Sequence, residues 1–252
     1  MGGAIVEGLI KGDFIENDDI CVADPSREMR DKFANMGVTA TPSNQLAAQG
    51  SDVVCVVVKP WLVEQVLTGI KDVLDYATQT LIVVAAGVKS ADIRTWMEKG
   101  SEMIPTFLVI PNIAIAQLQS MTFIVPAIAT EPHHIEKVRT LFDSMGHSII
   151  TDEQHLAAGT TLASCGIAYA MRYVRAASEG GVELGFKADV AKQIVMQTMR
   201  GAVELLEATG LHPEAAIDLV TTPGGVTIKG LNEMEHAGFT SSVIRGLKAG
   251  AK

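Results

Sequence analysis

The sequence predicts an α/β chain, with a doubly wound, mostly parallel sheet over residues 1–151 and an all-helical domain over residues 152–252. Three observations support this prediction. Short apolar runs rich in β-branched residues recur up to residue 151, and such near-continuous runs indicate strands covered on both faces. Helical patterns separate these runs, and strand–helix–strand repetition is typical of parallel sheets. No strand-like run follows Asp152.

Six strands are expected in the first domain, at residues 20–23, 53–58, 81–85, 107–110, 123–125 and 148–150. The helices between them are expected at residues 25–36, 61–74, 90–98 and 134–145. The chain itself opens on a helical pattern, whereas a doubly wound nucleotide-binding domain opens on a strand and a glycine-rich turn. We therefore expect that the first, central strand is missing from this chain and that its start is truncated.

The second domain has helical periodicity throughout. Helices are expected over residues 153–185, with a break at Gly180-Gly181, then over 188–209 and 213–220, and again after Thr227 and Thr240. These helices are rich in small and apolar residues and have few faces polar enough to lie in solvent. We therefore expect burial against a second copy in an obligate homodimer. A monomeric helical bundle is the alternative.

Composition narrows the possible partners. The chain of 252 residues has 48% hydrophobic residues, 19% charged residues and a net charge of −9, which argues against nucleic acid or an anionic membrane as the main partner. Cys21, Cys55 and Cys165 are far apart, and the histidines show no ligand spacing, so no metal site is expected. Unpaired cysteines and the lack of a leader or spanning segment favour the cytoplasm.

The segment from Val220 to Leu231 carries the strongest functional signal. Pro223 disfavours helix at the preceding Thr222, and Gly224-Gly225 permit backbone angles that other residues avoid. Thr227 is then the expected N-cap of the next helix. Backbone N–H groups and hydroxyls at a helix N-terminus suit a small carboxylate. The same pattern is also compatible with a purely structural turn.

This Thr-Thr-Pro-Gly-Gly-Val-Thr segment resembles the C-terminal signature of pyrroline-5-carboxylate reductases, and the downstream residues 231–239 agree with it. The resemblance extends in order along essentially the whole chain. It implies a Rossmann-type domain, a dimerisation domain and NADPH-dependent reduction of 1-pyrroline-5-carboxylate to L-proline, the last step of proline biosynthesis. The substrate carboxylate is then expected at Gly224, Gly225 and the Thr227 amide, with Thr222 adding a hydroxyl. The Thr227 hydroxyl is the candidate proton donor or relay to the ring nitrogen.

The residues at the end of the first expected strand indicate whether the cofactor is NAD or NADP. This position meets the adenosine ribose in doubly wound dehydrogenases, where an acidic residue favours NAD. Asp24 fits that role, whereas Ser26 and Arg27 could hold the 2′-phosphate of NADP. The resemblance adds Asn44, at a position that approaches the same phosphate. We expect NADP, with NAD as the alternative.

The resemblance also implies further cofactor contacts. Gly2 and Gly3 match the end of the family pattern GxGxMGxA, whose earlier glycines are not in this chain. Three more segments match family turns that flank the dinucleotide, and they contribute the residues Val58, Lys59, Pro60, Ala86, Gly87 and Asn112.

One segment departs from the family. The pattern S-G-S-G-P-A-Y is represented here by Ala163 to Tyr169, with Ile167 in place of proline, so the shape of the substrate pocket differs. Two alternatives stay open. The chain could reduce another imine or a keto acid, or it could be a non-catalytic homologue, which the missing glycine-rich turn would favour.

Overall fold

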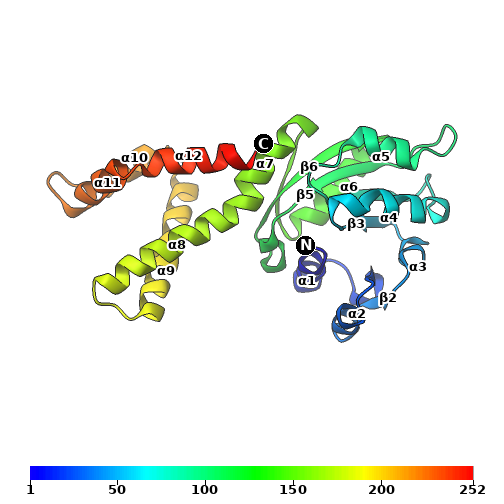
Figure 1. Cartoon of the computed structure of the whole chain (residues 1–252), viewed down its shortest axis with the longest axis horizontal. Coiled ribbons are helices and arrows are strands. Elements are labelled where there is room, and N and C mark those ends of the chain that lie inside the picture. The colour runs from blue at the N-terminus through cyan, green and yellow to red at the C-terminus, as the bar shows by residue number, and fades with distance from the viewer. Residues whose placement is uncertain (252) are drawn as a thin grey trace. The chain divides into compact units, whose positions relative to one another are not determined.

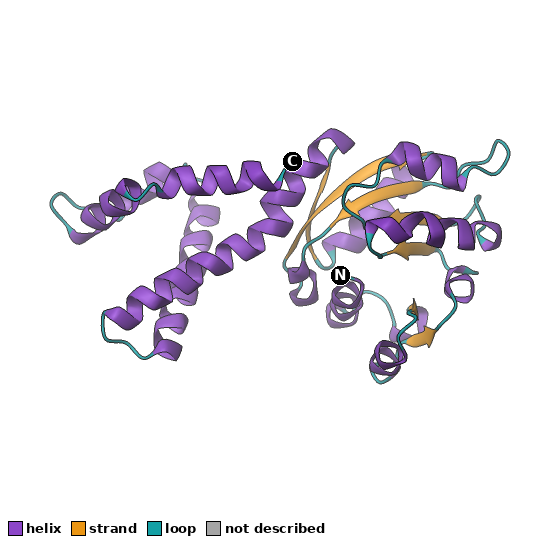
Figure 2. Cartoon of the chain, viewed as in Figure 1, coloured by secondary structure: helices purple, strands orange, loops and turns teal. Residues whose placement is uncertain are grey.

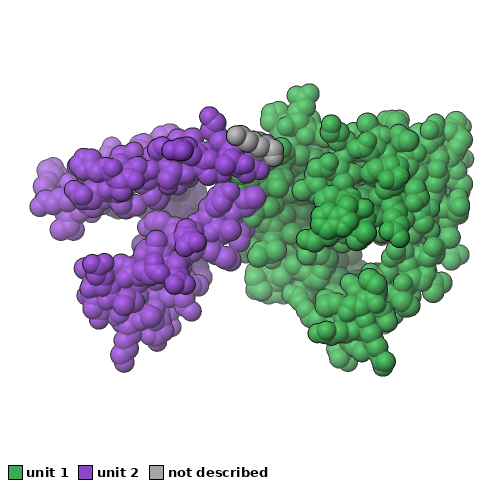
Figure 3. All heavy atoms as spheres, viewed as in Figure 1, with its two compact units in different colours: residues 1–164 green, residues 165–252 purple. Residues whose placement is uncertain are grey.

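The structure is a computed structural model that describes residues 1–251 (Figure 1). The chain divides into two compact units, residues 1–164 and the residues from Cys165 onward (Figure 3). Unit 1 contains every strand, and unit 2 is helical within the described residues (Figure 2). The α/β fold followed by a helical domain is therefore confirmed. No helix within residues 1–251 is both long and apolar enough to cross a membrane.

Unit 1 holds two separate sheets. The smaller sheet pairs β1 with β2 in parallel, and the larger one has the order β3-β4-β5-β6-β7. All neighbours are parallel except β5 and β6. The strands are β1 (Cys21–Ala23), β2 (Thr39–Thr41), β3 (Val53–Val56), β4 (Thr80–Val83), β5 (Thr106–Ile110), β6 (Ser120–Ile128) and β7 (Gly146–Ile150).

All six expected strands are present, and β2 is an additional one. This strand has only three residues, two of them threonines, so it lacks an apolar run. The helices of unit 1 are α1 (Gly2–Gly12), α2 (Arg27–Ala34), α3 (Asn44–Ala48), α4 (Val63–Ile70), α5 (Ser90–Met97), α6 (Pro132–Asp143) and α7 (Leu156–Gly159).

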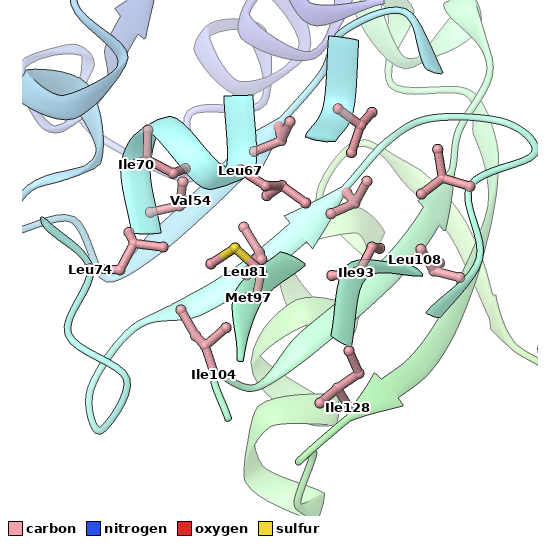
Figure 4. Close-up of a cluster of buried hydrophobic side chains, with 14 of the residues drawn as sticks. Val54, Leu67, Ile70, Leu74, Leu81, Ile93, Met97, Ile104, Leu108 and Ile128 are labelled. Atoms are coloured by element: carbon pink, nitrogen blue, oxygen red, sulfur yellow. The ribbon is translucent and has the colours of Figure 1, made fainter. Parts of the chain in front are cut away.

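The core of unit 1 lies on both faces of the larger sheet. Along β4, Leu81 and Val83 pack in one apolar cluster with residues of α4 and α5, part of which is shown in Figure 4. Ile82 points to the opposite face, into a second cluster that includes Phe107 and Phe142. Because successive side chains of a strand alternate between faces, burial of both sets explains the continuous apolar runs in the sequence.

A cavity of about 1350 Å³ separates the two sheets and is lined by residues of β1, β3 and α1. Figure 3 shows an opening through unit 1 in this region. Within residues 1–251, neither β1 nor β3 has a strand partner on its cavity side. The order β2, β1, gap, β3, β4, β5 is that of a doubly wound sheet without its first strand. The truncated start itself stays a prediction.

Unit 2 consists of α8 (Gly166–Glu183), α9 (Ala188–Thr209), α10 (Pro213–Leu219), α11 (Val226–His236) and α12 (Phe239–Gly250). The predicted break at Gly180-Gly181 is wrong, because α8 runs through both glycines. A Cβ on Gly181 would lie 2.9 Å from the Cβ of Ala191, so this glycine lets α8 and α9 approach closely. The irregularity lies earlier, in a π-helical turn at Thr160–Cys165.

Candidate functional site

The turn after β1 is shaped by its own polar groups. The Asp24 carboxylate accepts the Ser26 N–H at 2.8 Å, and the Ser26 hydroxyl accepts the Met29 N–H at 3.4 Å, which caps α2. Arg30 donates to the carbonyls of Asp24 and Pro25 at 2.7 and 2.8 Å. Arg30 is not among the predicted site residues, because in the sequence it looks like an ordinary surface charge of a helix. Asp24 is thus already engaged within the turn.

Ser26 and Arg27 lie side by side at the N-terminus of α2, where backbone N–H groups and the helix dipole favour an anion. The Arg27 side chain is 86% exposed, and its guanidinium lies 3.6 Å from the Asp31 carboxylate. Such an exposed ion pair is weak, so the guanidinium can turn toward a ligand at little cost. Asn44 is exposed at the first position of α3, directly after β2, and lines the cavity.

The end of β3 combines a half-buried residue with an exposed group. Val58 contacts the core and lines the cavity, whereas Lys59 and Pro60 are exposed at the start of a short 3-10 helix. Trp61 follows, and 76% of it is exposed. The sequence predicts Trp61 only as the first residue of a helix. An exposed indole beside a lysine offers a flat face on which a planar ring can stack.

The ends of β4 and β5 carry the next candidates. Ala86 and Gly87 are exposed, and Gly87 has a φ of +81°, which disfavours any other residue. Asn112 is buried, with its side-chain oxygen accepting the Ala114 N–H at 2.9 Å and its own N–H donating to the Ser120 hydroxyl at 3.2 Å. Asn112 therefore shapes its turn.

Gly2 and Gly3 form the first turn of α1 and line the cavity. A Cβ on either would meet its nearest neighbour at an ordinary 3.7 or 3.5 Å, so space alone does not require glycine there. Gly8 is different, because its Cβ would lie 2.5 Å from the carbonyl oxygen of Ile115. The close contact of α1 with the segment Ile113–Gln117 depends on Gly8, which is not among the predicted site residues.

These cofactor candidates share one location in the fold. Except for Gly2 and Gly3, they follow the carboxyl ends of β1 to β5, which run parallel within each sheet. Doubly wound sheets bind their ligands at this edge. Gly2, Gly3, Asn44 and Val58 also line the same cavity. Within residues 1–251, no three potential ligand side chains cluster as a metal site would require.

Two cysteines line the same cavity. Burial raises the pKa of the Cys55 thiol to about 12, and burial also raises the pKa of Cys21. Cys55 is exposed on the cavity wall, and the protein atoms packed beside its thiol disfavour the thiolate. Neither cysteine therefore has the low pKa that a nucleophilic cysteine requires.

In unit 2, the Pro-Gly-Gly segment forms a tight turn between α10 and α11. The Gly225 N–H donates to the Thr222 carbonyl at 3.0 Å, with Pro223 and Gly224 at the two central positions. Gly224 has a φ of +71°. A Cβ on Gly225 would lie 2.6 Å from the Thr222 hydroxyl oxygen, so the turn requires glycine there.

Helix α11 begins two residues earlier than predicted. Its N-cap is Gly225, with no side-chain cap bond, so the prediction of Thr227 as N-cap is wrong. Thr227 instead lies in the first turn, with an exposed side chain. N–H groups in the first turn of a helix have no partner within that helix. Thr222, Gly224, Gly225 and Thr227 are thus brought together around a helix N-terminus.

Two protein families match successive parts of the chain. Residues 153–252 match the family described as pyrroline-5-carboxylate reductase dimerisation, and residues 1–87 match the family described as NADP oxidoreductase, coenzyme F420-dependent. The chain is 31% identical to pyrroline-5-carboxylate reductase of Pisum sativum, over all of this chain and 90% of that protein. It is 35% identical to pyrroline-5-carboxylate reductase 1 of Dictyostelium discoideum, over 98% of this chain and 46% of that protein.

Solved structures show the same fold. The pyrroline carboxylate reductase of Plasmodium falciparum, crystallised with NADP bound, superposes with a TM-score of 0.89 at 23% identity, over all of this chain and 92% of that one. The 1-pyrroline-5-carboxylate reductase of Streptococcus pyogenes superposes with a TM-score of 0.86 at 27% identity. The match covers 99% of this chain and 93% of that one. A helical dimerisation domain follows an NADP-binding domain, and the chain belongs to the pyrroline-5-carboxylate reductase family.

Proposed function

We propose that this chain reduces 1-pyrroline-5-carboxylate to L-proline with NADPH. The observation that carries the proposal is the turn from Thr222 to Thr227, where a glycine turn and a helix N-terminus meet two hydroxyl side chains. Family membership supports the same reaction, because relatives at about one-third identity bear that name.

The residues at the ends of β1 and β2 fit NADP. Ser26 and Arg27 offer a hydroxyl, a guanidinium and a helix N-terminus to a 2′-phosphate. Asp24 points its carboxylate at the Ser26 N–H, so the repulsion expected from this charge is reduced. Asn44 adds an exposed amide after the neighbouring strand. The cofactor, when bound, supplies the hydride.

The chain's own residues then bind and orient the imine. The amides of Gly224 and Thr227 hold the substrate carboxylate, and Thr222 adds a hydroxyl. Gly225, whose N–H closes the turn on the Thr222 carbonyl, gives the site its shape. The imine carbon takes a hydride and the ring nitrogen takes a proton, so the C=N bond becomes an amine. The Thr227 hydroxyl is a weak acid and therefore relays this proton from water. Most of the rate enhancement comes from positioning.

Unit 2 supports assembly as a homodimer. Its residues match a dimerisation family, and its helices expose large apolar side chains that a second copy would cover. The most exposed of these on α9 are Val203, Ile194 and Met196.

The proposal is tested with Thr227→Val, which removes the hydroxyl and keeps the shape. We expect turnover to fall about 100-fold, the lower range for a positioned proton donor, with NADPH affinity unchanged. NADPH oxidation with pyrroline-5-carboxylate, followed by cofactor absorbance, measures the loss. Thr227→Ser is the matched control and retains most of the turnover. Unchanged turnover in Thr227→Val would remove Thr227 from the mechanism.

A second candidate is a related reductase that acts on another imine or a keto acid. The observation that favours it is the segment Ala163 to Ile167, which departs from the family pattern and has Ile167 in place of proline. A panel of cyclic imines and keto acids separates the two candidates. A chain that binds no NADPH would instead fit a non-catalytic homologue.

A further inference from the structure

A carboxylate far away in sequence caps helix α5. Both carboxylate oxygens of Glu153 lie 3.3 Å from the Ser90 backbone nitrogen, and the Ser90 hydroxyl donates to the same carboxylate. Lys89, the N-cap of α5, makes no side-chain cap bond. Glu153 therefore supplies the missing cap and places a negative charge at the positive end of the helix dipole.

This contact holds one end of the loop that contains Gly87. The other end is held by the sheet, because the Val84 N–H donates to the Val56 carbonyl at 2.9 Å. Ala86 and Gly87 between these anchors are exposed, and Gly87 has a positive φ. At the α5 end, Val88 packs in the core, and Glu153 adds a polar anchor beside it.

A second contact reaches the next loop along the sheet. The Ser164 hydroxyl donates to the Pro111 carbonyl at 2.9 Å, next to Asn112 and directly after β5. Ser164 stands where the family pattern S-G-S-G-P-A-Y has glycine, which has no side chain to make this bond. The contact is therefore a property of this chain rather than of the pattern.

The residues between the two contacts lie against the sheet. A Cβ on Gly159 would be 2.9 Å from the Phe123 ring of β6, so only glycine allows this approach. The π-helical turn at Thr160–Cys165 follows at once, and such turns occur frequently at functional sites. We call residues 153–164 the strap.

We propose that Glu153 and Ser164 are positioning residues, and that the strap holds the loops after β4 and β5 in the conformation that binds a dinucleotide. The inference rests on the proposed function for its cofactor. A loop that is already ordered does not lose conformational freedom on binding, so a strap that fixes it raises affinity without touching the ligand. Loss of a contact then lowers the fraction of competent protein.

The first test uses Glu153→Ala in the full chain without cofactor. Amide hydrogen exchange in the peptide covering residues 85–90 is expected to speed up about tenfold, since the loop loses its polar anchor at the α5 end. Exchange within β5 is expected to stay unchanged. Asp152→Asn is the matched control. It removes the adjacent negative charge, and asparagine can still accept the His155 N–H that caps the short helix Glu153–His155.

The second test measures NADPH affinity directly by titration. Glu153→Ala is expected to raise the Kd about tenfold, and Ser164→Gly about threefold, while kcat at saturating NADPH stays within about twofold of the wild type. Glu153→Gln keeps one acceptor and is expected to fall between Glu153→Ala and the wild type. The double variant Ser90→Ala, Glu153→Ala is expected to bind NADPH no more weakly than Glu153→Ala alone, because both changes remove the same contact.

Unchanged hydrogen exchange and unchanged NADPH affinity in Glu153→Ala would overturn the inference. A loss of NADPH affinity in Asp152→Asn as large as that in Glu153→Ala would overturn it as well. A wild-type chain that binds NADPH but does not reduce pyrroline-5-carboxylate would remove the proposed function and leave both readouts of the strap in place. A wild-type chain that binds no dinucleotide would overturn both.

Discussion

The two units bury their apolar residues very differently. In unit 1, the larger sheet is covered on both faces, and side chains such as Phe107, Leu81 and Ile82 have no exposed surface. In unit 2, the buried apolar residues among those described are Ala191 and Ala216. Unit 1 thus forms its core within one chain. Unit 2 has helices whose apolar faces lack such a core, which is the pattern of a subunit interface.

The largest expected effect is on the core of unit 1. Phe107→Ala leaves a cavity between the sheet and its covering helices and is expected to lower the free energy of unfolding by about 3–5 kcal/mol. The matched change in unit 2 is Val203→Ala, at a residue that is 53% exposed, with an expected cost within about 0.5 kcal/mol for the monomer. Denaturant unfolding at low protein concentration measures both values. Equal losses would contradict the comparison.

A second effect concerns assembly. Ile194→Glu places a charge on the exposed apolar face of α9 and is expected to raise the dimer dissociation constant at least about tenfold, because the charge would be buried unpaired. Light scattering over a dilution series measures this change. Gln193→Glu adds the same charge to the neighbouring exposed residue and serves as control. If both variants dimerise like the wild type, α9 is not part of the interface.

The smallest effect concerns the cavity side of unit 1. Folding raises the Cys55 pKa from 9.0 to about 12, so the folded chain keeps a proton that the unfolded chain releases. The unfolding free energy therefore falls as pH rises between these two values. At about pH 8.5, alkylation of Cys55 by iodoacetamide is expected to be at least about tenfold slower in the folded chain than in denaturant. Equal alkylation rates in the folded and the unfolded chain would show that the fold does not protect the Cys55 thiol.

The sequence predicted the strands well because a buried parallel strand carries its own signal, a run of β-branched residues. It missed β2, which is too short to produce such a run. The break expected at Gly180-Gly181 is absent because close contact of Gly181 with α9 outweighs the low helix propensity of glycine. Thr227 was assigned as N-cap because threonine favours that position, whereas the turn geometry places Gly225 there.

The candidate site was predictable to the extent that its residues follow strand ends or form one local motif. The strap was not, because its contacts join residues 63 and 53 positions apart. No local pattern relates Glu153 to Ser90, or Ser164 to Pro111. Such contacts follow from how the sheet brings the loops after β4 and β5 near residues that come much later in the chain.

The cavity between β1 and β3 has a consequence for ligand binding. No strand pairing joins the small sheet to the large one within residues 1–251, so β1 and β2 can open together without breaking the pairing of β3 with β4. A ligand that contacts the ends of both β1 and β3 would bind only the closed form. By thermodynamic linkage, each tenfold excess of that ligand over its Kd would stabilise the closed arrangement by about 1.4 kcal/mol. The ligand would then act as the missing connection between the two sheets.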